Sequence, residues 1–402
     1  MGRQQDIDLT VQDRGFPGFL KRLEVSRAVI HEPLDGSAVA REWGRIASSV
    51  QRMGGSGPVT LVVNDSTRPP SGPMITSLED ILDRETRIIV ATGTHRPVSE
   101  DEKEALLGGC FSGSAWKNSD CDSDGMVHIG TTSRGTPVGF DPWILDGGPV
   151  IAVNSVEPHY FAGFTGGRKS FLPGVASRSA IVANHYLACL PGSQPGKLEG
   201  NPVHEDMNEA LSMLEQRVGI LQGNGVMHGG KLVGFFAGTC TESFESAAGL
   251  SSEIARLPVP RAVDVLVLHP GEPLHMNLYQ SEKALYNCSG MVSEGGWMLL
   301  VSSCPEGLGA DHLRRAFISS RDPGWRAPDR ESYRLGDHAI VRLREMRERL
   351  SIALASGLPD GTVREMGMEP VDDVEVWLGR FEGSSMSFIP SAGFVVPCIE
   401  ES

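Results

Sequence analysis

The sequence predicts an α/β protein with two domains, each built on a mostly parallel sheet flanked by helices. Short apolar, β-branched runs alternate with helical stretches, which is the pattern of this fold class. The chain has 402 residues, enough for two hydrophobic cores. A Pro-rich stretch near Leu257 separates two blocks of this alternation. We therefore expect one α/β domain over 1–258 and another over 259–402, with the last residues as a candidate for return to the first domain.

Three strands are expected in the first block, and a polar turn follows each of them. The strands are expected at 60–64, 87–91 and 149–154. In open α/β sheets, ligands bind beyond the carboxyl ends of the strands. The three turns are therefore expected to lie at a ligand-binding edge of the sheet.

The second block predicts one β-α-β unit and suggests another. The expected elements are a strand at 264–268, a helix at 276–291, a strand at 296–301, a helix at 339–354 and a strand at 374–378. We find no internal repeat and no low-complexity tract in the chain.

The composition excludes several classes of protein. A net charge of −15 argues against binding to nucleic acid or to an anionic membrane surface. The seven cysteines are scattered singly, with no C-x-x-C pair, so neither a disulfide framework nor a zinc knuckle is indicated. No apolar run approaches the length of a membrane span. The expected location is a reducing cytoplasm.

The segment 163–170 is a glycine-rich turn that ends in a lysine. It nearly matches the phosphate loop G-x-x-x-x-G-K-[ST], but Arg168 replaces the second glycine, which disfavours a nucleotide triphosphatase. Lys169 is either a solvent-facing lysine on a common glycine turn or a covalent anchor for a cofactor, since a desolvated amine is nucleophilic.

Three histidines accompany this lysine. His185 lies in a helical run and is either a hydrogen-bonded structural residue or a ligand for nickel, zinc or iron. One histidine cannot hold a metal alone, so an organic cofactor would have to supply most of the ligands. His95 and His159 follow the second and third strands and are either ordinary loop histidines or an acid/base pair. Two bases on opposite faces of a substrate are what inversion at a carbon atom requires.

Several other polar residues are candidates for binding, and some of them have a structural interpretation as well. Arg68 is suited to a fork contact with a carboxylate or phosphate, or to a surface ion pair. Asp65 can bind a ribose, fix a histidine or cap its own turn. Tyr279, Gln280 and Lys283 are expected to lie together on a helix, where they could reach a substrate across the domain cleft. By contrast, His204 is expected to be structural, in a helix that Asn201 caps.

Taken together, these motifs resemble the lactate racemase family, whose enzymes use a nickel-pincer nucleotide. The resemblance rests on four motifs: 65–69, 92–97, 157–169 with His185 sixteen residues beyond Lys169, and 279–283. They span roughly residues 60–290, in an order and spacing that chance explains poorly.

The resemblance implies a role for each of these residues. Lys169 would be joined covalently to a Ni(II) pyridinium-3-thioamide-5-thiocarboxylic acid mononucleotide, with His185 as the protein ligand of nickel. His95 and His159 would be the opposed acid and base, in an active site in the cleft between the domains. Substrate would be bound by Arg68, Tyr279, Gln280 and Lys283. The cofactor would also contact Asp65, Thr67, Thr92, Gly93, Gly166 and Gly167, so that 1–258 would be the cofactor-binding domain.

The implied activity is racemisation or epimerisation of a lactate-like 2-hydroxy acid by hydride abstraction and return. The C–H beside a carboxylate is barely acidic, so removal of hydride, with a histidine taking the hydroxyl proton, is the easier route. The implied partners are a small 2-hydroxy acid and the proteins that build the cofactor. Three alternatives remain open: an epimerase of a larger sugar acid with the same cofactor, a zinc hydrolase with His95, His159 and His185 as ligands, and a non-catalytic cofactor-binding protein.

Overall fold

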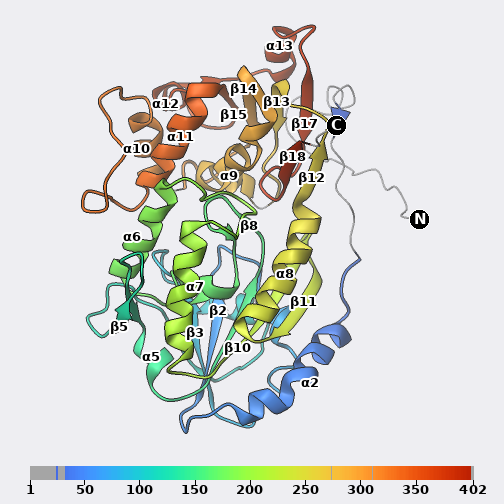
Figure 1. Cartoon of the computed structure of the whole chain (residues 1–402). Helices are drawn as coiled ribbons and strands as arrows, with labels where there is room; N and C mark the ends of the chain where they lie inside the picture. Colours follow the sequence, from blue (N-terminus) through green and yellow to red (C-terminus); the bar gives the residue numbers. More distant parts are fainter. Residues whose placement is uncertain (1–23, 26–31, 273, 310, 400–402) are drawn as a thin grey trace. The chain divides into compact units, whose positions relative to one another are not determined.

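A computed structural model of the chain describes residues 24–25, 32–272, 274–309 and 311–399. The chain divides into two compact units (Figure 1). Of the described residues, the larger unit contains 32–255 and 328–338, and the smaller unit contains 24–25, 256–272, 274–309, 311–327 and 339–399. The segment 328–338 therefore packs with the larger unit although the chain on either side of it belongs to the smaller one.

The larger unit is built on a six-stranded sheet in the order β11-β10-β7-β2-β3-β4. Its strands are β2 (Val59–Asn64), β3 (Thr86–Ala91), β4 (Ala115–Asn118), β7 (Val150–Ser155), β10 (Ile220–His228) and β11 (Lys231–Gly238). Only the β10–β11 pair is antiparallel; the other neighbours run parallel. The mostly parallel sheet that the sequence predicts is confirmed, and the three expected strands of the first block are β2, β3 and β7.

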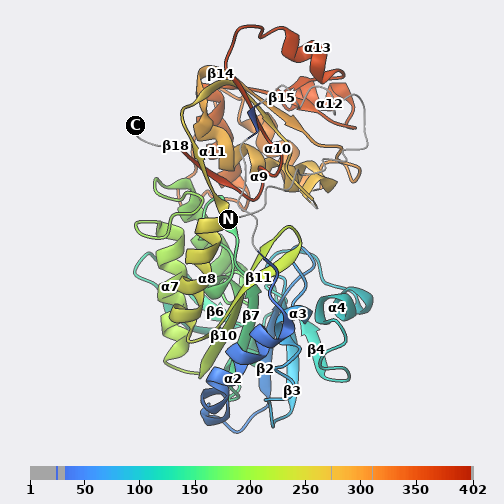
Figure 2. The same ribbon diagram turned by 90° about the vertical axis from the view of Figure 1, so that its right-hand side faces the viewer.

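Helices cover both faces of this sheet, because its buried strands present apolar side chains on both sides. On β2, Leu61 and Val63 pack in a cluster with Trp43, whereas Val62 packs in a separate cluster with Met207. Figure 2 shows α7 on one side of the sheet and α3 and α4 on the other. The helices of this unit are α2 (Gly36–Arg52), α3 (Gly72–Ile75), α4 (Glu100–Leu107), α5 (Pro142–Leu145), α6 (Arg178–Tyr186), α7 (Pro202–Glu215) and α8 (Cys240–Ala255).

Short elements complete the larger unit. They are the hairpin of β5 (Val127–Thr131) and β6 (Pro137–Phe140), the pair β8 (Pro158–His159) and β9 (Gly163–Phe164), and the 3-10 turns η1 (Gly167–Ser170) and η2 (Leu187–Cys189). The predicted cap of α7 is confirmed, since Asn201 Oδ1 accepts hydrogen bonds from the backbone N–H groups of Val203 and His204.

The smaller unit contains a fully parallel six-stranded sheet in the order β1-β17-β13-β14-β15-β16. Its strands are β1 (Glu24–Val25), β13 (Val263–Leu268), β14 (Val292–Val301), β15 (Ser351–Ala355), β16 (Glu369–Pro370) and β17 (Met386–Ile389), and β12 (Arg256–Val259) pairs separately with β18 (Val396–Ile399). Its helices are α9 (Leu278–Cys288), α10 (Asp311–Ser319), α11 (Asp337–Arg349), α12 (Asp360–Glu365) and α13 (Val374–Gly379), with the 3-10 turns η3 (Leu274–Met276) and η4 (Ser289–Met291) on either side of α9. The first two residues of α11, Asp337 and His338, belong to the larger unit.

Two predictions for the second block are wrong. The expected strand 374–378 is α13, because the Asp373 side chain accepts from the Val376 N–H and begins a helix that buries Trp377 while Val376 is 71% exposed. The helix expected at 339–354 is too long, because α11 ends at Arg349 and residues 351–355 form strand β15. A continuous apolar run is compatible with either structure, so the sequence pattern could not separate them.

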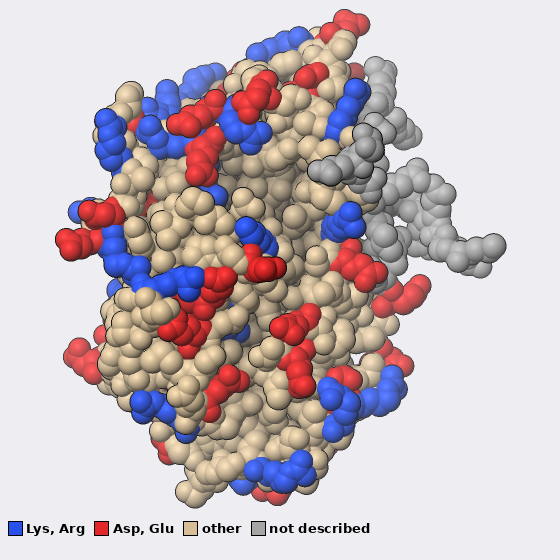
Figure 3. All heavy atoms as spheres, viewed as in Figure 1, with Lys and Arg blue, Asp and Glu red and all other residues tan. Residues whose placement is uncertain are grey.

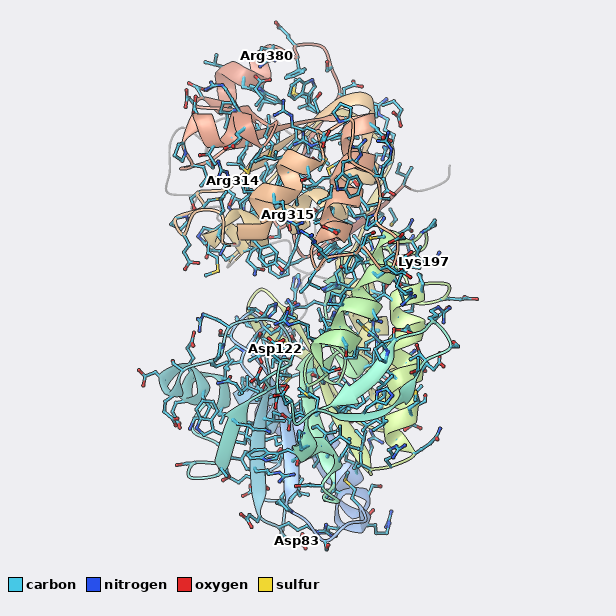
Figure 4. The ribbon with its side chains drawn as sticks, turned by 90° about the vertical axis from the view of Figure 1, so that its left-hand side faces the viewer. Asp83, Asp122, Lys197, Arg314, Arg315 and Arg380 are labelled. Atoms are coloured by element: carbon cyan, nitrogen blue, oxygen red, sulfur yellow. The ribbon has the colours of Figure 1, made fainter. Side chains whose placement is uncertain are left out.

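The surface carries charges of both signs. On the face of the molecule that Figure 3 shows, acidic and basic side chains are interspersed, with neither sign of charge filling the whole face. Directly after α13, Arg380, which Figure 4 labels, forms an ion pair with Glu369 and lies over the Trp377 ring, 5.5 Å from its centroid. Within the described ranges, no helix is both long enough and apolar enough to span a bilayer.

Candidate active site

Three polar turns of the larger unit meet at one edge of its sheet. In the parallel register, Asn64 pairs with Ala91 and Val63 pairs with Val153, so β2, β3 and β7 end side by side. Asp65 follows β2 directly and Thr92 follows β3 directly. The convergence that the sequence predicts for these turns is therefore a consequence of the strand register.

His95 and Asp65 form a hydrogen-bonded pair across two of these turns. His95 Nδ1 lies 2.6 Å from Asp65 Oδ2, while Asp65 Oδ1 accepts from the Thr67 N–H at 3.1 Å and from the Thr67 hydroxyl at 2.6 Å. Burial of Asp65 favours the neutral acid, but the bonds from His95 and Thr67 outweigh it and lower the pKa of this carboxyl. An ionised Asp65 accepts the Nδ1–H of His95, which leaves Nε2 of the ring as the basic nitrogen. The His95 side chain is 42% exposed and accessible to a ligand.

The ring of Phe161 is the contact point of three predicted site residues. It packs edge-on against His159, with ring centroids 4.5 Å apart, and against His185 at 5.1 Å. The amine of Lys169 lies 5.3 Å from the centroid of the same ring. His159 also stacks on Tyr160 at 5.1 Å, and its Nδ1 accepts weakly from the Ala162 N–H at 3.4 Å.

A buried polar network holds the turn η1, which carries Lys169. Asn224 Oδ1 accepts from the Gly167 N–H at 3.0 Å, and the Gln222 amide donates to the Gly167 carbonyl at 3.2 Å. Both side chains come from β10 and are fully buried. One residue after the lysine, the Ser170 hydroxyl donates to Asn154 Oδ1, on β7. Bonds to two strands of the sheet thus fix the backbone on both sides of Lys169.

The two glycines before this lysine are required by the protein's own packing. Gly166 and Gly167 have φ angles of 73° and 55°. A Cβ at Gly166 would lie 2.6 Å from Val156, and one at Gly167 would lie 2.5 Å from the Phe244 ring. Contact of either glycine with a cofactor stays a prediction, because these collisions explain both residues without one.

His185 lies on α6, which is anchored at its first turn. The Ser177 hydroxyl caps the helix, and Arg178 binds Asp122, which Figure 4 labels, with one N–O distance of 2.6 Å. Burial, followed by the charges of Lys169, His338 and His95, holds the pKa of His185 well below its usual range. The ring is therefore neutral near pH 7, the form that binds a metal.

The environment of His185 fits a metal ligand. Its Nδ1 is buried and makes no hydrogen bond of normal geometry in the described part of the chain, although the Ile181 carbonyl, one helical turn earlier, is a polar neighbour of the ring. Among the residues that the structure describes, no three histidine, cysteine, aspartate or glutamate side chains form a group able to hold a metal ion. His95, His159 and His185 therefore do not form such a group in this structure. A metal on His185 would take its remaining ligands from a bound organic group.

The other predicted site residues have partners of their own. Thr92 is buried and donates its hydroxyl to the Ser119 carbonyl at 2.7 Å, and the Gly93 N–H donates to the Gly174 carbonyl at 3.0 Å. Arg68 is half-buried in the turn after β2. The contacts predicted for these residues and for Asp65 and Thr67 with cofactor or substrate stay predictions.

Tyr279, Gln280 and Lys283 lie on α9 of the smaller unit. Asn277 caps this helix by accepting from the Gln280 N–H at 3.0 Å, and Lys283 Nζ donates to the Gln280 side-chain oxygen at 2.6 Å. Gln280 and Lys283 thus lie on one face of the helix, as expected, and are hydrogen-bonded to each other. Their binding of substrate stays a prediction.

Sequence reasoning did not identify five side chains near the site. Phe161 lies inside the motif 157–169, but nothing in its spacing distinguishes it from a core residue. Tyr333 and His338 have no local signal at all, since they belong to the returning segment 328–338. The polar Gln222 and Asn224 do give a signal, because buried amides interrupt an otherwise apolar strand.

Fold and site define the larger unit as a doubly wound α/β domain whose strand-end turns present histidines and a lysine. Residues 45–196 match the family model described as the lactate racemase N-terminal domain. A lactate racemase of Thermoanaerobacterium thermosaccharolyticum is 31% identical over 275 residues, and one of Lactiplantibacillus plantarum is 29% identical over 276 residues. Each match covers 66% of this chain and 64% of the relative's length.

Solved structures agree with the sequence matches. The apoprotein of the lactate racemase from T. thermosaccharolyticum superposes with a TM-score of 0.83 at 25% identity, covering 92% of this chain and 94% of that one. A Thermotoga maritima crystal structure has the same fold, with a TM-score of 0.73 at 17% identity, covering 92% of this chain and 100% of that one. These matches confirm the resemblance to the lactate racemase family that the sequence predicts.

Proposed function

We propose that this protein is an isomerase that racemises or epimerises a lactate-like 2-hydroxy acid with a nickel-pincer nucleotide. The observation that supports this most directly is the arrangement around Phe161, whose ring contacts His159, His185 and the amine of Lys169. An anchor, a metal ligand and an acid/base group are the functions that such a cofactor requires of the protein. The relatives named lactate racemase support the same reaction class.

Lys169 and His185 would hold the cofactor. Lys169 lies on a turn fixed by buried bonds to the sheet, which suits a covalent anchor because the amine is presented from a rigid backbone. His185 is neutral at physiological pH, and its buried Nδ1 makes no hydrogen bond of normal geometry in the described residues. When bound, the cofactor supplies an acceptor for hydride that the protein's own side chains cannot provide.

His95 would take the hydroxyl proton of the substrate. Asp65 accepts from Nδ1 of this ring, so Nε2 is the free basic nitrogen, and the carboxylate stabilises the imidazolium that forms. His159 would take the equivalent proton on the opposite face of the substrate. Each histidine would act as base for one enantiomer and return a proton for the other.

Cationic side chains would bind the substrate carboxylate. Because the net charge of the chain is −15, an anionic substrate needs local positive charge to bind. Arg68 would provide a fork contact, and Lys283, with Gln280 and Tyr279, would contribute from α9. A cytoplasmic location is part of the proposal, and so is dependence on proteins that build the cofactor. None of the seven cysteines forms a disulfide bond in the described part of the chain, which is consistent with a reducing compartment.

The decisive experiment combines intact mass, nickel content and racemisation. The full chain is produced together with the proteins that build the cofactor and tested on a panel of chiral 2-hydroxy acids, including lactate. We expect Lys169→Ala to lose the added mass, the nickel and the activity. Lys197→Ala removes an exposed lysine of the same unit, labelled in Figure 4, and should retain all three. Full activity of Lys169→Ala, or zinc without nickel in the active parent protein, would overturn the proposal.

A further inference from the structure

The returning segment 328–338 contributes a histidine to the surroundings of the candidate site. His338 is only 5% exposed, and both of its ring nitrogens have tyrosine partners. Its Nε2 lies 2.9 Å from the Tyr160 hydroxyl, and its Nδ1 lies 2.7 Å from the Tyr333 hydroxyl. A ring held at both nitrogens has a fixed orientation, because rotation about its bond to Cβ would break both hydrogen bonds.

This fixed ring touches the aromatic residues that surround Lys169. His338 packs edge-on against Phe161, with centroids 4.9 Å apart, and against His185 at 6.1 Å. Tyr160, which is bound to His338 through its hydroxyl, stacks on His159 at 5.1 Å. The Tyr333–His338–Tyr160 chain therefore reaches both His185 and His159, one directly and the other through a stacked ring.

The segment is held in the larger unit by further contacts. Tyr333 is 5% exposed and packs edge-on against Tyr186 at 5.8 Å, and the Arg330 guanidinium lies 5.0 Å from the centroid of the same Tyr186 ring. Leu335 packs against the core cluster of this unit. These contacts fix the position of the segment, so Tyr333 and His338 are held by packing as well as by hydrogen bonds.

We propose that His338, clamped by Tyr333 and Tyr160, is a positioning residue that orients the imidazoles of His185 and His159 for their functions. This inference rests on the proposed function for the roles of His185 and His159. The orientation of the His185 and His159 rings by His338 does not depend on that function, because the ring contacts are present in the protein without cofactor. The inference also explains why residues 328–338 pack with the larger unit. They bring His338 to a site whose other residues lie earlier in the sequence.

Tyr333→Phe tests the inference with the smallest change. The substitution keeps the ring that packs against Tyr186 and removes only the hydroxyl that binds His338. Tyr186→Phe is the matched control, since it removes a hydroxyl from the neighbouring ring, outside the chain to His338. Both variants should unfold within about 3 °C of the parent protein, because one net hydrogen bond is a small part of the stability of a chain this long.

The first measurement uses the full chain without cofactor. Ring ¹⁵N–¹H correlation spectra of the histidines report on their environments. We expect the His185 and His159 signals to shift in Tyr333→Phe and in His338→Phe, and to stay in place in Tyr186→Phe. Unshifted signals in Tyr333→Phe and His338→Phe would overturn the positioning role, whatever the protein catalyses.

The second measurement uses the loaded enzyme and separates this inference from the proposed function. With Tyr333→Phe we expect kcat to fall about tenfold with KM within about twofold, and nickel to be lost faster to a chelator. Tyr333→Phe should have no further effect on kcat in a His338→Phe background, because both act through one ring. Additive losses of kcat, or parental rates in Tyr333→Phe, would refute the inference while leaving the proposed function intact. A parent protein that carries no nickel cofactor or shows no racemisation would refute the proposed function. The histidine spectra would then still test whether His338 orients His185 and His159.

Discussion

Replacement of Asp65 by asparagine should switch His95 to the wrong tautomer. In the parent protein, Asp65 Oδ2 accepts from His95 Nδ1 at 2.6 Å, and Oδ1 is bound by Thr67. An asparagine can keep its oxygen on Thr67, so its NH₂ group then faces His95. Since that amide donates, Nδ1 must give up its proton and Nε2 must carry it. The nitrogen proposed to accept the substrate proton is then blocked.

The size of the effect follows from the bond that is lost. A hydrogen bond to a charged group contributes about 1.5–3 kcal/mol. At about 1.4 kcal/mol per decade of rate, its loss in the transition state lowers kcat roughly 10- to 150-fold. KM should change little, because Asp65 is not proposed to contact the substrate.

The assay compares Asp65→Asn with Asp83→Asn, an exposed aspartate of the same unit that Figure 4 labels. Chiral chromatography gives the initial rate of enantiomer conversion, and metal analysis confirms that both proteins carry equal nickel. Rates of Asp65→Asn within twofold of Asp83→Asn at equal loading would refute the orienting role of Asp65.

Stability gives an independent check without cofactor. The pKa of Asp65 is lowered from 3.8 in the folded protein. Its carboxylate therefore contributes stability above about pH 4, and this contribution is lost as the pH falls through the lower folded pKa. The parent protein should be more stable than Asp65→Asn near neutral pH, and the difference should shrink in acid. A difference that grows with acid would contradict this sign.

The remaining predictions concern the histidines and one glycine. His95→Ala and His159→Ala should retain nickel but racemise at least about 100-fold more slowly, as expected for loss of an acid/base group, by metal analysis and chiral assay. Burial, with the charge of Arg168, lowers the pKa of His204 to about 3, so this histidine should destabilise the fold by about 2 kcal/mol at pH 5 relative to pH 8. His204→Gln should remove that part of the pH dependence of chemical denaturation. Gly167→Ala should lower stability by about 1–3 kcal/mol in the same assay, because its φ is 55° and its new Cβ meets Phe244 at 2.5 Å.

The sequence predicted well those features that depend on neighbouring residues. The strands at 60–64, 87–91 and 149–154 are apolar runs that end in polar turns, and buried parallel strands have this pattern. The cap at Asn201 was equally predictable, because capping involves only the next three residues. The predicted strand 374–378 failed for the same local reason, since one aspartate cap decided the structure of an ambiguous apolar run.

The sequence by itself determined the chemical groups, their order and the edge of the sheet where they gather. Only the tertiary structure decided which of them touch. Asp65 lies 30 residues from His95, and Tyr160 lies 178 residues from His338, yet both pairs are hydrogen-bonded. Local patterns record which face of an element is buried, whereas contacts between distant segments depend on strand register and on how the chain returns. The ring of Phe161 became the centre of the site for that reason, because its neighbours come from turns, a helix and a returning segment that no single stretch of sequence contains.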